Sequence, residues 1–490
     1  MSKFEQFVNS PYVSPTLAGL GTGLYPLFFY YSNNYALINS WNHLGFFIVL
    51  FLISPVIFFW LCHFIFKKIG QKRKIKAFVF FNVSAFLGFI VLCLYAGAKI
   101  GLMAGAFGIG ALFAAFLSKH FKKFVLLQLV LASINLFWLI PIIFEQLNYN
   151  DSWIQQPDNI EQATFTKKPN VYYIQPDGYV NFSEQNKGYY KLGENPHQGY
   201  LEAKEFKLYP DIRSNYTSTV ISNAATFMMK HHFYNYGFNF TEITNGRQII
   251  MSDNPVLKIF KKNGYKTHFI SELPYLLANK PKIGYDKCNF NESNISYITN
   301  GFNGKQNVLD SLGRYLKEDI DKPKFFFIQV FKPGHVPSKR DESKGFEGDK
   351  ERWVQNLEIS NRQQQEVIDT ILASDSNALI MIMSDHGGYL GWKNMMGIRT
   401  KTEDVDKLYS AFSTNLAIKW PDKAPPAFDA KFKTGINVFR ILFSYLSDDT
   451  SYLENLQDDS SYTIIEYGAP KGIYKVLDAN GKMVFEKRDK

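Results

Sequence analysis

The sequence predicts a chain in two parts: an N-terminal bundle of about five transmembrane helices, then an α/β domain with a largely parallel central sheet. Three observations support this prediction. No Asp, Glu, Lys or Arg occurs from Gln6 to Phe66. Further apolar stretches continue to about residue 145. Beyond about residue 148 charged residues become regular, and short apolar runs typical of strands alternate with helical patterns.

Five apolar stretches are each close to the roughly 20 residues that a helix needs to cross the core of a bilayer. They cover residues 12–31, 43–66, 77–96, 99–118 and 123–145, and prolines shorten the first. Because further spans follow the first directly, we do not expect a cleavable signal peptide. We therefore predict a transmembrane domain over residues 1–146, a linker over 147–168 and a hydrophilic domain over 169–490.

The basic charge of the chain indicates how the predicted helices are oriented. The net charge is +10, and much of the excess lies in two clusters between apolar stretches: Lys67, Lys68, Lys72, Arg73, Lys74, Lys76 and Lys119, Lys122, Lys123. Loops rich in Lys and Arg stay in the cytoplasm. With five crossings, the N-terminus is then cytoplasmic and the hydrophilic domain lies outside. We expect an integral, multi-pass protein of a bacterial inner membrane with an extracytoplasmic, periplasmic domain. No nucleic-acid-binding module accompanies the charge, so no nucleic-acid partner is expected.

The hydrophilic domain must be stabilised by its core rather than by disulfides. The chain has three cysteines, and Cys288 alone lies in this part. A disulfide within the domain is therefore excluded. At roughly 320 residues, the domain is large enough to bury a sizeable hydrophobic core.

Four short apolar runs in the hydrophilic domain predict strands: Val171–Gln175, Thr267–Ile270, Phe325–Phe331 and Ala378–Met383. The last two are nearly continuous, which is typical of central strands covered by helices on both faces. A long helix is expected over Glu351–Leu372, before the fourth strand. This alternation favours an α/β fold with a largely parallel sheet.

Chemistry-bearing side chains follow three of these strands. Asp177 comes after the first strand, His335 after the third, and Asp385 and His386 after the fourth. In open α/β sheets, ligands bind beyond the carboxyl ends of the strands. Carboxylate and imidazole donors together suit Zn²⁺ or Mn²⁺. The sequence therefore predicts a site for a divalent metal at this edge of the sheet.

These segments resemble the alkaline phosphatase superfamily, in its sulfatase-like branch. KPNVYYIQPDGY resembles the family's opening strand, LKIFKKNGYKTHFIS its helix–strand unit with Gly-Tyr-x-Thr, and IMSDHGG its Asp-His-Gly metal motif. They occur in the family's order, over roughly residues 168–420. With the apolar N-terminal part, the chain resembles membrane-anchored lipoteichoic acid synthases and phosphoethanolamine transferases. The resemblance implies that residues 169–490 form a catalytic domain.

The resemblance also implies where the nucleophile lies, between the first motif and the Gly-Tyr-x-Thr unit. Sulfatases use a modified Cys or Ser in C/S-x-P-x-R, and this pattern is absent here. The transferases use an unmodified Thr in T-x-x-S, which Thr219 to Ser222 matches. Thr219 is therefore the predicted nucleophile, with Thr217 and Ser218 as rivals.

By the same resemblance, one metal ion is held by Asp177, Thr219, Asp385 and His386. The closest transferases carry Glu at the first of these positions, whereas sulfatases and phosphodiesterases carry Asp. His335 could bind substrate phosphate, hold a second metal or protonate the leaving group. No further His after the Asp-His-Gly motif matches the transferases, so the sequence does not decide between one metal and two.

Four further residues are weaker candidates for substrate binding: Lys393, Arg399, His231 and His232. Lys and Arg are ordinarily surface residues, and the two histidines lie in an aromatic-rich segment that favours a structural loop.

The resemblance implies a metal-dependent transferase. It would move phosphoethanolamine or phosphoglycerol from a membrane phospholipid donor to a glycan or lipid acceptor of the cell envelope, through a phospho-threonine intermediate. The alternative is a membrane-anchored phosphodiesterase, phosphatase or sulfuric ester hydrolase of the same superfamily. The sequence names neither the head group, the acceptor nor the metal.

Overall fold

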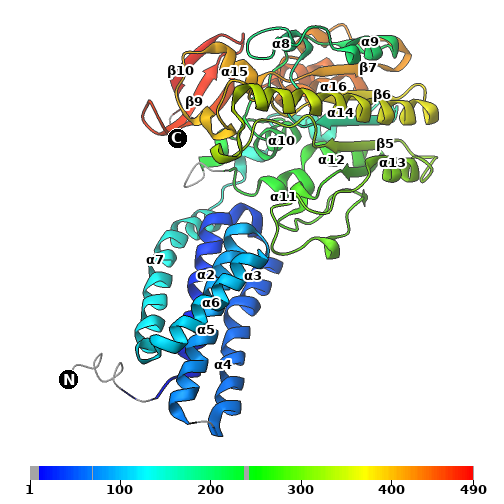
Figure 1. Ribbon diagram of the computed structural model, residues 1–490. Helices are drawn as coiled ribbons and strands as arrows, with labels where there is room; N and C mark the ends of the chain where they lie inside the picture. Colours follow the sequence, from blue (N-terminus) through cyan, green and yellow to red (C-terminus); the bar gives the residue numbers. More distant parts are fainter. Residues whose placement is uncertain (1–9, 11, 69, 237–241, 489–490) are drawn as a thin grey trace. The chain divides into compact units, whose positions relative to one another are not determined.

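The computed structural model describes residues 10, 12–68, 70–236 and 242–488. The chain divides into two compact units. The first takes in the chain up to Tyr149 with two later segments, 278–280 and 295–303, and the second takes in the rest. Each unit is described by itself below (Figure 1).

The first unit is mainly helical over its described residues from Pro15 to Leu147. Its helices are α2 (Pro15–Ile38), α3 (Trp41–Ile48), a π-helical turn (Val49–Ile53), α4 (Ser54–Ile65), α5 (Gln71–Tyr95), α6 (Ile100–Phe116) and α7 (Phe121–Leu147). Each of the five predicted stretches is therefore helical. A buried polar network ties three of the helices together. The Asn82 amide donates to Thr22 Oγ1 (2.8 Å) and Gln128 Oε1 (3.1 Å), and Gln128 Nε2 donates back to Asn82 Oδ1 (2.9 Å). Polar groups that leave water need such partners.

The prediction of five membrane-spanning helices is confirmed for three. Among the described residues, three helical stretches are long and apolar enough to cross a membrane: Trp41–Lys68, Gln71–Tyr95 and Ser118–Leu147. α6 is apolar but has only 17 residues. α2 is 24 residues long, but its Gly, Tyr and Asn residues leave it less apolar than these three stretches. A proline inside a helix is not the reason, because α7 contains Pro141 and lies within the third stretch.

The second unit is built on a seven-stranded sheet with the order β2-β7-β6-β1-β5-β3-β4. The strands are β1 (Val171–Pro176), β2 (Lys207–Leu208), β3 (Lys266–Ser271), β4 (Lys287–Cys288), β5 (Lys324–Val330), β6 (Leu379–Met383) and β7 (Leu416–Lys419). All four predicted strands are confirmed, as β1, β3, β5 and β6. β1 lies between β5 and β6 and is parallel to both, with Val171 opposite Phe325 and Leu379.

The sheet is mixed, so the prediction of a largely parallel sheet is confirmed for five neighbouring strands and not for the edge formed by β7 and β2. β7 pairs antiparallel with β6, and β2 pairs antiparallel with β7. The strands β6, β1, β5, β3 and β4 are parallel. An antiparallel strand beside an edge is common in such sheets. The direction of a strand depends on the path of the chain before it, which the short apolar run of β7 does not reveal.

Helices cover both faces of the sheet (Figure 1). The helices are α8 (Phe182–Gln185), α9 (Pro196–Ala203), α10 (Thr219–Met228), α11 (Gly246–Met251), α12 (Pro255–Lys262), α13 (Val308–Leu316), α14 (Gly345–Ser374), α15 (Val405–Phe412) and α16 (Val438–Ser447). On one face, Leu201 of α9, Leu312 of α13 and Ile371 of α14 join the core with alternate strand residues. On the other face, α10, α12 and α16 place aromatic rings against β1 and β5, as in the Phe260–Phe325 stack at 4.2 Å. The continuous burial of the central strands follows from this double cover.

A small second sheet completes this unit. It is antiparallel, with the order β10-β9-β8, and consists of β8 (Ser461–Ile465), β9 (Gly472–Leu477) and β10 (Met483–Lys487). The predicted long helix is confirmed within α14.

Candidate metal centre

Three potential metal ligands converge at the carboxyl ends of β1 and β6. Asp177 follows β1 directly, and Asp385 and His386 come one and two residues after Ser384, which follows β6. Because the two strands are neighbouring and parallel, their ends meet at the same edge. His386 Nε2 lies 3.3 Å from Asp177 Oδ1 and 3.6 Å from Asp385 Oδ2. One ligand atom from each residue lies within 4.8 Å of the others, and all three residues are buried.

The donor set fits a divalent cation. Asp385 Oδ2 is buried and has no hydrogen-bond partner in the described part of the chain. An unpaired buried carboxylate oxygen is costly unless a positive group binds it. His386 Nδ1 contacts the Gly387 carbonyl at 2.9 Å, so that Nδ1 carries the proton and Nε2 offers its lone pair to the cluster. Asp177, Asp385 and His386 would hold the ion, and two carboxylates with one imidazole suit Zn²⁺ and Mn²⁺ alike.

The electrostatics of the cluster also favour added positive charge. Burial raises the pKa of Asp385 to about 6, against the opposing effect of His386. Burial lowers the pKa of His386, but the carboxylates of Asp385 and Asp177 act the other way and the net shift is upward. A bound cation would satisfy both carboxylates without a proton.

Thr219 lies beside this cluster. It is the first residue of α10, and its Oγ1 lies 3.5 Å from His386 Nε2. Of its two rivals, Thr217 places its hydroxyl 3.2 Å from that of Tyr234. Ser218 occupies the N-cap of α10 but makes no capping hydrogen bond with its side chain. The structure thus brings the Thr219 hydroxyl to the three candidate metal ligands, at a helix N-terminus that favours anionic groups.

His335 reaches the same place from the end of β5. Its ring centroid lies 5.7 Å from that of His386, and its Nδ1 contacts the Val336 carbonyl at 2.5 Å. Burial lowers the pKa of His335, and Asp177 partly offsets that shift. A neutral imidazole beside the cluster is suited to exchanging a proton with a reacting group.

Two glycines let the Asp177 and His335 segments touch. Gly334 N donates to the Asp177 carbonyl at 2.8 Å. Gly178 has φ +67°, and a Cβ at this position would lie 2.1 Å from the Gly334 carbonyl oxygen. Only glycine allows both this conformation and this approach. The Asp-Gly and Gly-His pairs are visible in the sequence, but their contact is not.

Tyr389 is a site residue that the sequence did not reveal. It has φ +63°, a left-handed conformation that is unusual for a bulky residue and often marks a functional constraint. Its hydroxyl donates to the Thr217 carbonyl, two residues before Thr219. Its ring centroid lies 5.7 Å from that of His386 and 6.2 Å from that of His335. Its place directly after Asp-His-Gly-Gly was the only available signal.

The weaker candidates lie elsewhere or have other partners. His231 contacts the Asp458 carbonyl at 2.7 Å, and the ring of His232 stacks on Tyr216 at 4.2 Å. Both histidines belong to an aromatic cluster around Tyr216 and not to the group of candidate metal ligands. Lys393 is exposed. Arg399 pairs with Glu466 at 3.2 Å and lines a pocket of about 100 Å³ with Thr217, Ser218, Tyr234 and Tyr389.

Comparisons with known proteins agree with these motifs. The sulfatase family model matches residues 181–447, more than half of the chain. No curated protein matched the sequence. Similar solved structures include the C-terminal periplasmic domain of EptC from Escherichia coli, with 12% identity, a TM-score of 0.42, and coverage of 63% of this chain and 93% of that one. The lipoteichoic acid synthase LtaP from Listeria monocytogenes has 12% identity, a TM-score of 0.42, and coverage of 66% and 91%. The integral membrane lipooligosaccharide phosphoethanolamine transferase A from Neisseria meningitidis has 14% identity, a TM-score of 0.39, and coverage of 89% and 95%.

Proposed function

The chain belongs to the sulfatase family, and from this premise we propose that it is a membrane-anchored, metal-dependent transferase of a phospho-head group. The observation that carries the proposal is the Thr219 hydroxyl beside Asp177, Asp385 and His386. The C/S-x-P-x-R pattern of sulfatases is absent from the sequence. An unmodified threonine in that place favours transfer of a phosphoryl group over hydrolysis of a sulfate ester.

The chain's own residues account for the steps of the reaction. Thr219 Oγ attacks the phosphorus of a phospholipid, and the bond from phosphorus to the glycerol oxygen breaks. His335, a neutral imidazole, takes up the proton of the Thr219 hydroxyl and gives it to that oxygen, and diacylglycerol leaves. An acceptor hydroxyl then attacks the phosphorus of the phospho-threonine ester, the P–O bond to Thr219 breaks, and the acceptor's proton passes to Thr219 Oγ through His335. When bound, a divalent cation supplies the positive charge that favours the deprotonated hydroxyl and offsets charge on the phosphoryl oxygens.

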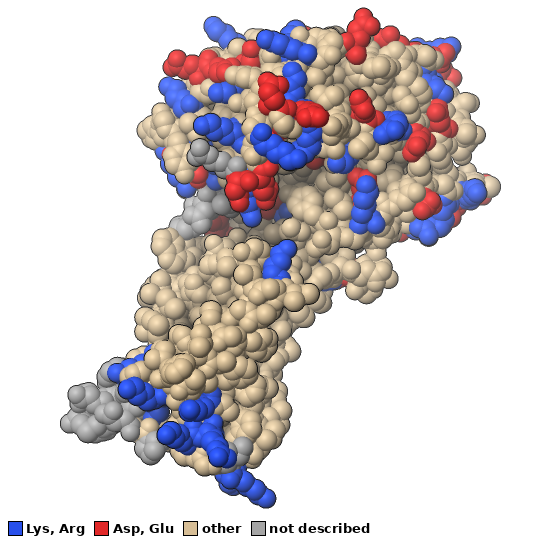
Figure 2. All heavy atoms as spheres, in the orientation of Figure 1, with Lys and Arg blue, Asp and Glu red and all other residues tan. Residues whose placement is uncertain are grey.

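Membrane anchoring supports a lipid donor. Three helices of the chain suffice to span a membrane, and tethering raises the local concentration of lipid substrates. The Lys and Arg side chains of the helical unit gather mostly at one end of it, as expected for a cytoplasmic end (Figure 2). We infer five crossings, a cytoplasmic N-terminus and an extracytoplasmic catalytic domain in a bacterial inner membrane. The acceptor would be a glycan or lipid of the cell envelope.

A hydrolase is the second candidate, because Asp at position 177 fits the phosphodiesterases and sulfatases better than the closest transferases. It would use the same residues, with water in place of the acceptor. Phosphoethanolamine and phosphoglycerol are the head groups we propose, with Zn²⁺ or Mn²⁺ as the metal.

Mass spectrometry of the protein purified from its own membranes tests the proposal. We expect a phospho-head-group adduct on Thr219 that is absent from Thr219→Ala, and its mass identifies the donor. An adduct on Thr217 or Ser218 would reassign the nucleophile. No adduct with metal and phospholipid supplied, together with release of free head-group phosphate, would favour the hydrolase.

A further inference from the structure

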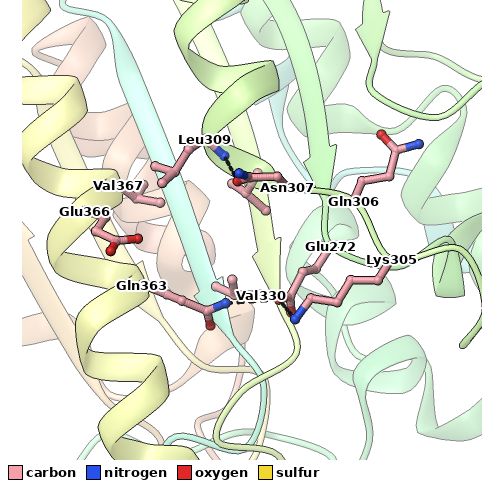
Figure 3. Close-up of a pocket in the computed structure, with 10 residues that line it drawn as sticks. Glu272, Lys305, Gln306, Asn307, Leu309, Val330, Gln363, Glu366 and Val367 are labelled. Atoms are coloured by element: carbon pink, nitrogen blue, oxygen red, sulfur yellow. Dashed lines mark hydrogen bonds and ion pairs between the residues drawn. The ribbon is translucent and has the colours of Figure 1, made fainter.

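A second pocket lies at the same edge of the sheet, away from the candidate metal ligands. It has a volume of about 450 Å³ and lies between α13, α14 and the ends of β3 and β5 (Figure 3). Its apolar lining comes from Val308, Leu309, Val330 and Val367. Its polar lining comes from Glu272, Lys305, Gln306, Asn307, Gln363 and Glu366. The proposed reaction assigns no role to any of these side chains.

Glu272 is the buried centre of the polar lining, and donors surround it. Its side chain is 4% exposed, whereas that of Lys305 is 63% exposed. Lys305 Nζ lies 2.8 Å from Glu272 Oε1, Gln363 Nε2 donates to the same oxygen at 3.0 Å, and Phe331 N donates to Oε2 at 2.9 Å. A buried carboxylate thus depends on an ammonium group from a long, solvent-exposed side chain. This arrangement already shows how the pocket receives an ammonium.

Hydrogen-bond acceptors remain in excess. Gln363 Oε1 is buried without a partner in the described part of the chain, and Glu366 is an exposed residue of the lining that water rather than a cation satisfies at present. Figure 3 shows Gln363 and Glu366 extending from α14, and Glu272 joined to Lys305 across from them. The two carboxylates outnumber the one ammonium of the lining. A ligand that completes this pocket must supply N–H donors and positive charge.

We propose that this pocket binds a small ligand with a primary ammonium group, held by Glu366 and Gln363 and able to replace Lys305 at Glu272. The apolar lining suits the short carbon chain that carries such a group. The site adjoins the reaction centre through the backbone, because Val330 O accepts from Asp177 N at 2.9 Å. Glu272 in turn fixes Phe331, four residues before His335. The inference goes beyond the proposed function and does not depend on it.

Calorimetry or ligand-observed NMR on the full-length protein in detergent tests the site, with ethanolamine as the probe and ethylene glycol as its uncharged counterpart. We expect ethanolamine to bind at least about tenfold more tightly than ethylene glycol. Glu366→Gln should weaken ethanolamine binding by about tenfold. Glu358→Gln is the matched control, because it removes the same charge from an exposed position of α14 outside the pocket.

Lys305→Met gives the sharpest test, because loss of a competing ammonium should strengthen binding. We expect ethanolamine affinity to rise roughly threefold to tenfold. If the pocket residues had only a structural role, removing the Lys305 ammonium would not raise the affinity for ethanolamine. The proposal is overturned by no binding to the wild type, equal binding of ethylene glycol, equal effects of Glu366→Gln and Glu358→Gln, or unchanged or weaker binding to Lys305→Met.

Discussion

Gly178→Ala should push apart the two backbone segments that bring Asp177 and His335 together. The new Cβ would lie 2.1 Å from the Gly334 carbonyl oxygen, whereas ordinary contact begins at 3.4 Å, so the two segments must part by about 1.3 Å. The left-handed backbone of position 178 adds about 1 kcal/mol of strain. Loss of the Gly334 N to Asp177 O hydrogen bond adds about 1 kcal/mol. With the remaining steric cost, we expect a destabilisation of about 2–4 kcal/mol.

The same displacement should weaken metal binding, because Asp177 is a predicted ligand. We expect a loss in metal affinity of about 100-fold, as for other disturbances of ligand position. The matched control is Gly193→Ala, at a glycine with φ +82° where no atom lies within 4 Å of the position that a Cβ would occupy. It should cost only about 1 kcal/mol of strain and leave metal affinity unchanged.

Denaturant unfolding of the full-length protein in detergent and calorimetric titration with Zn²⁺ or Mn²⁺ provide the two measurements. Equal destabilisation by Gly178→Ala and Gly193→Ala would show that the close approach of the two segments makes no contribution to the free energy of unfolding. Undiminished metal affinity in Gly178→Ala would refute the assignment of Asp177 as a ligand held by this contact.

Three further predictions concern the metal, the nucleophile loop and pH. Asp385→Ala should lower metal affinity by ~100-fold or more while the domain stays folded, as measured by metal analysis and circular dichroism; full retention of metal would contradict the assigned ligand set. Tyr389→Phe leaves the buried Thr217 carbonyl without its donor, so the free energy of unfolding should fall by about 1–3 kcal/mol. The rate of adduct formation on Thr219 should fall by about tenfold with little change in metal affinity; an unchanged rate would rule out a positioning role. Burial raises the pKa of Glu184 to about 7. Because the folded pKa is raised, stability is greatest below the unfolded pKa of about 4.3 and falls as pH rises to about 7. Glu184→Gln should therefore be stabilising by roughly 1–2 kcal/mol at pH 8 and nearly neutral at pH 4, after allowance for partial exposure. Thermal unfolding at both pH values checks this, and a pH-independent difference would count against it.

The sequence alone predicted the division of the chain, the central strands and the donor residues of the candidate centre. These features are local. The charge-free stretch up to Phe66 and the continuous apolar runs of β5 and β6 record the environment of each segment directly. The strand–acid and strand–Asp-His-Gly motifs also fix where donors emerge, because each follows its strand within a few residues.

Other features depend on which distant segments meet, and a pattern within one segment cannot report them. The antiparallel direction of β7 follows from the path of the chain between Met383 and Leu416. The T-x-x-S match favoured Thr219 but left Thr217 and Ser218 as rivals. The tertiary structure places the Thr219 hydroxyl beside His386 and the Thr217 hydroxyl beside that of Tyr234.

The contacts that position the residues of the candidate centre also join distant segments. The Asp177–Gly334 contact and the hydrogen bond from Tyr389 to the Thr217 loop join residues more than 150 positions apart. The His231–His232 pair, a weaker candidate for substrate binding in the sequence, packs on Tyr216 within an aromatic cluster. Local sequence set the chemistry available to this protein, and long-range packing decided which groups face one another to use it.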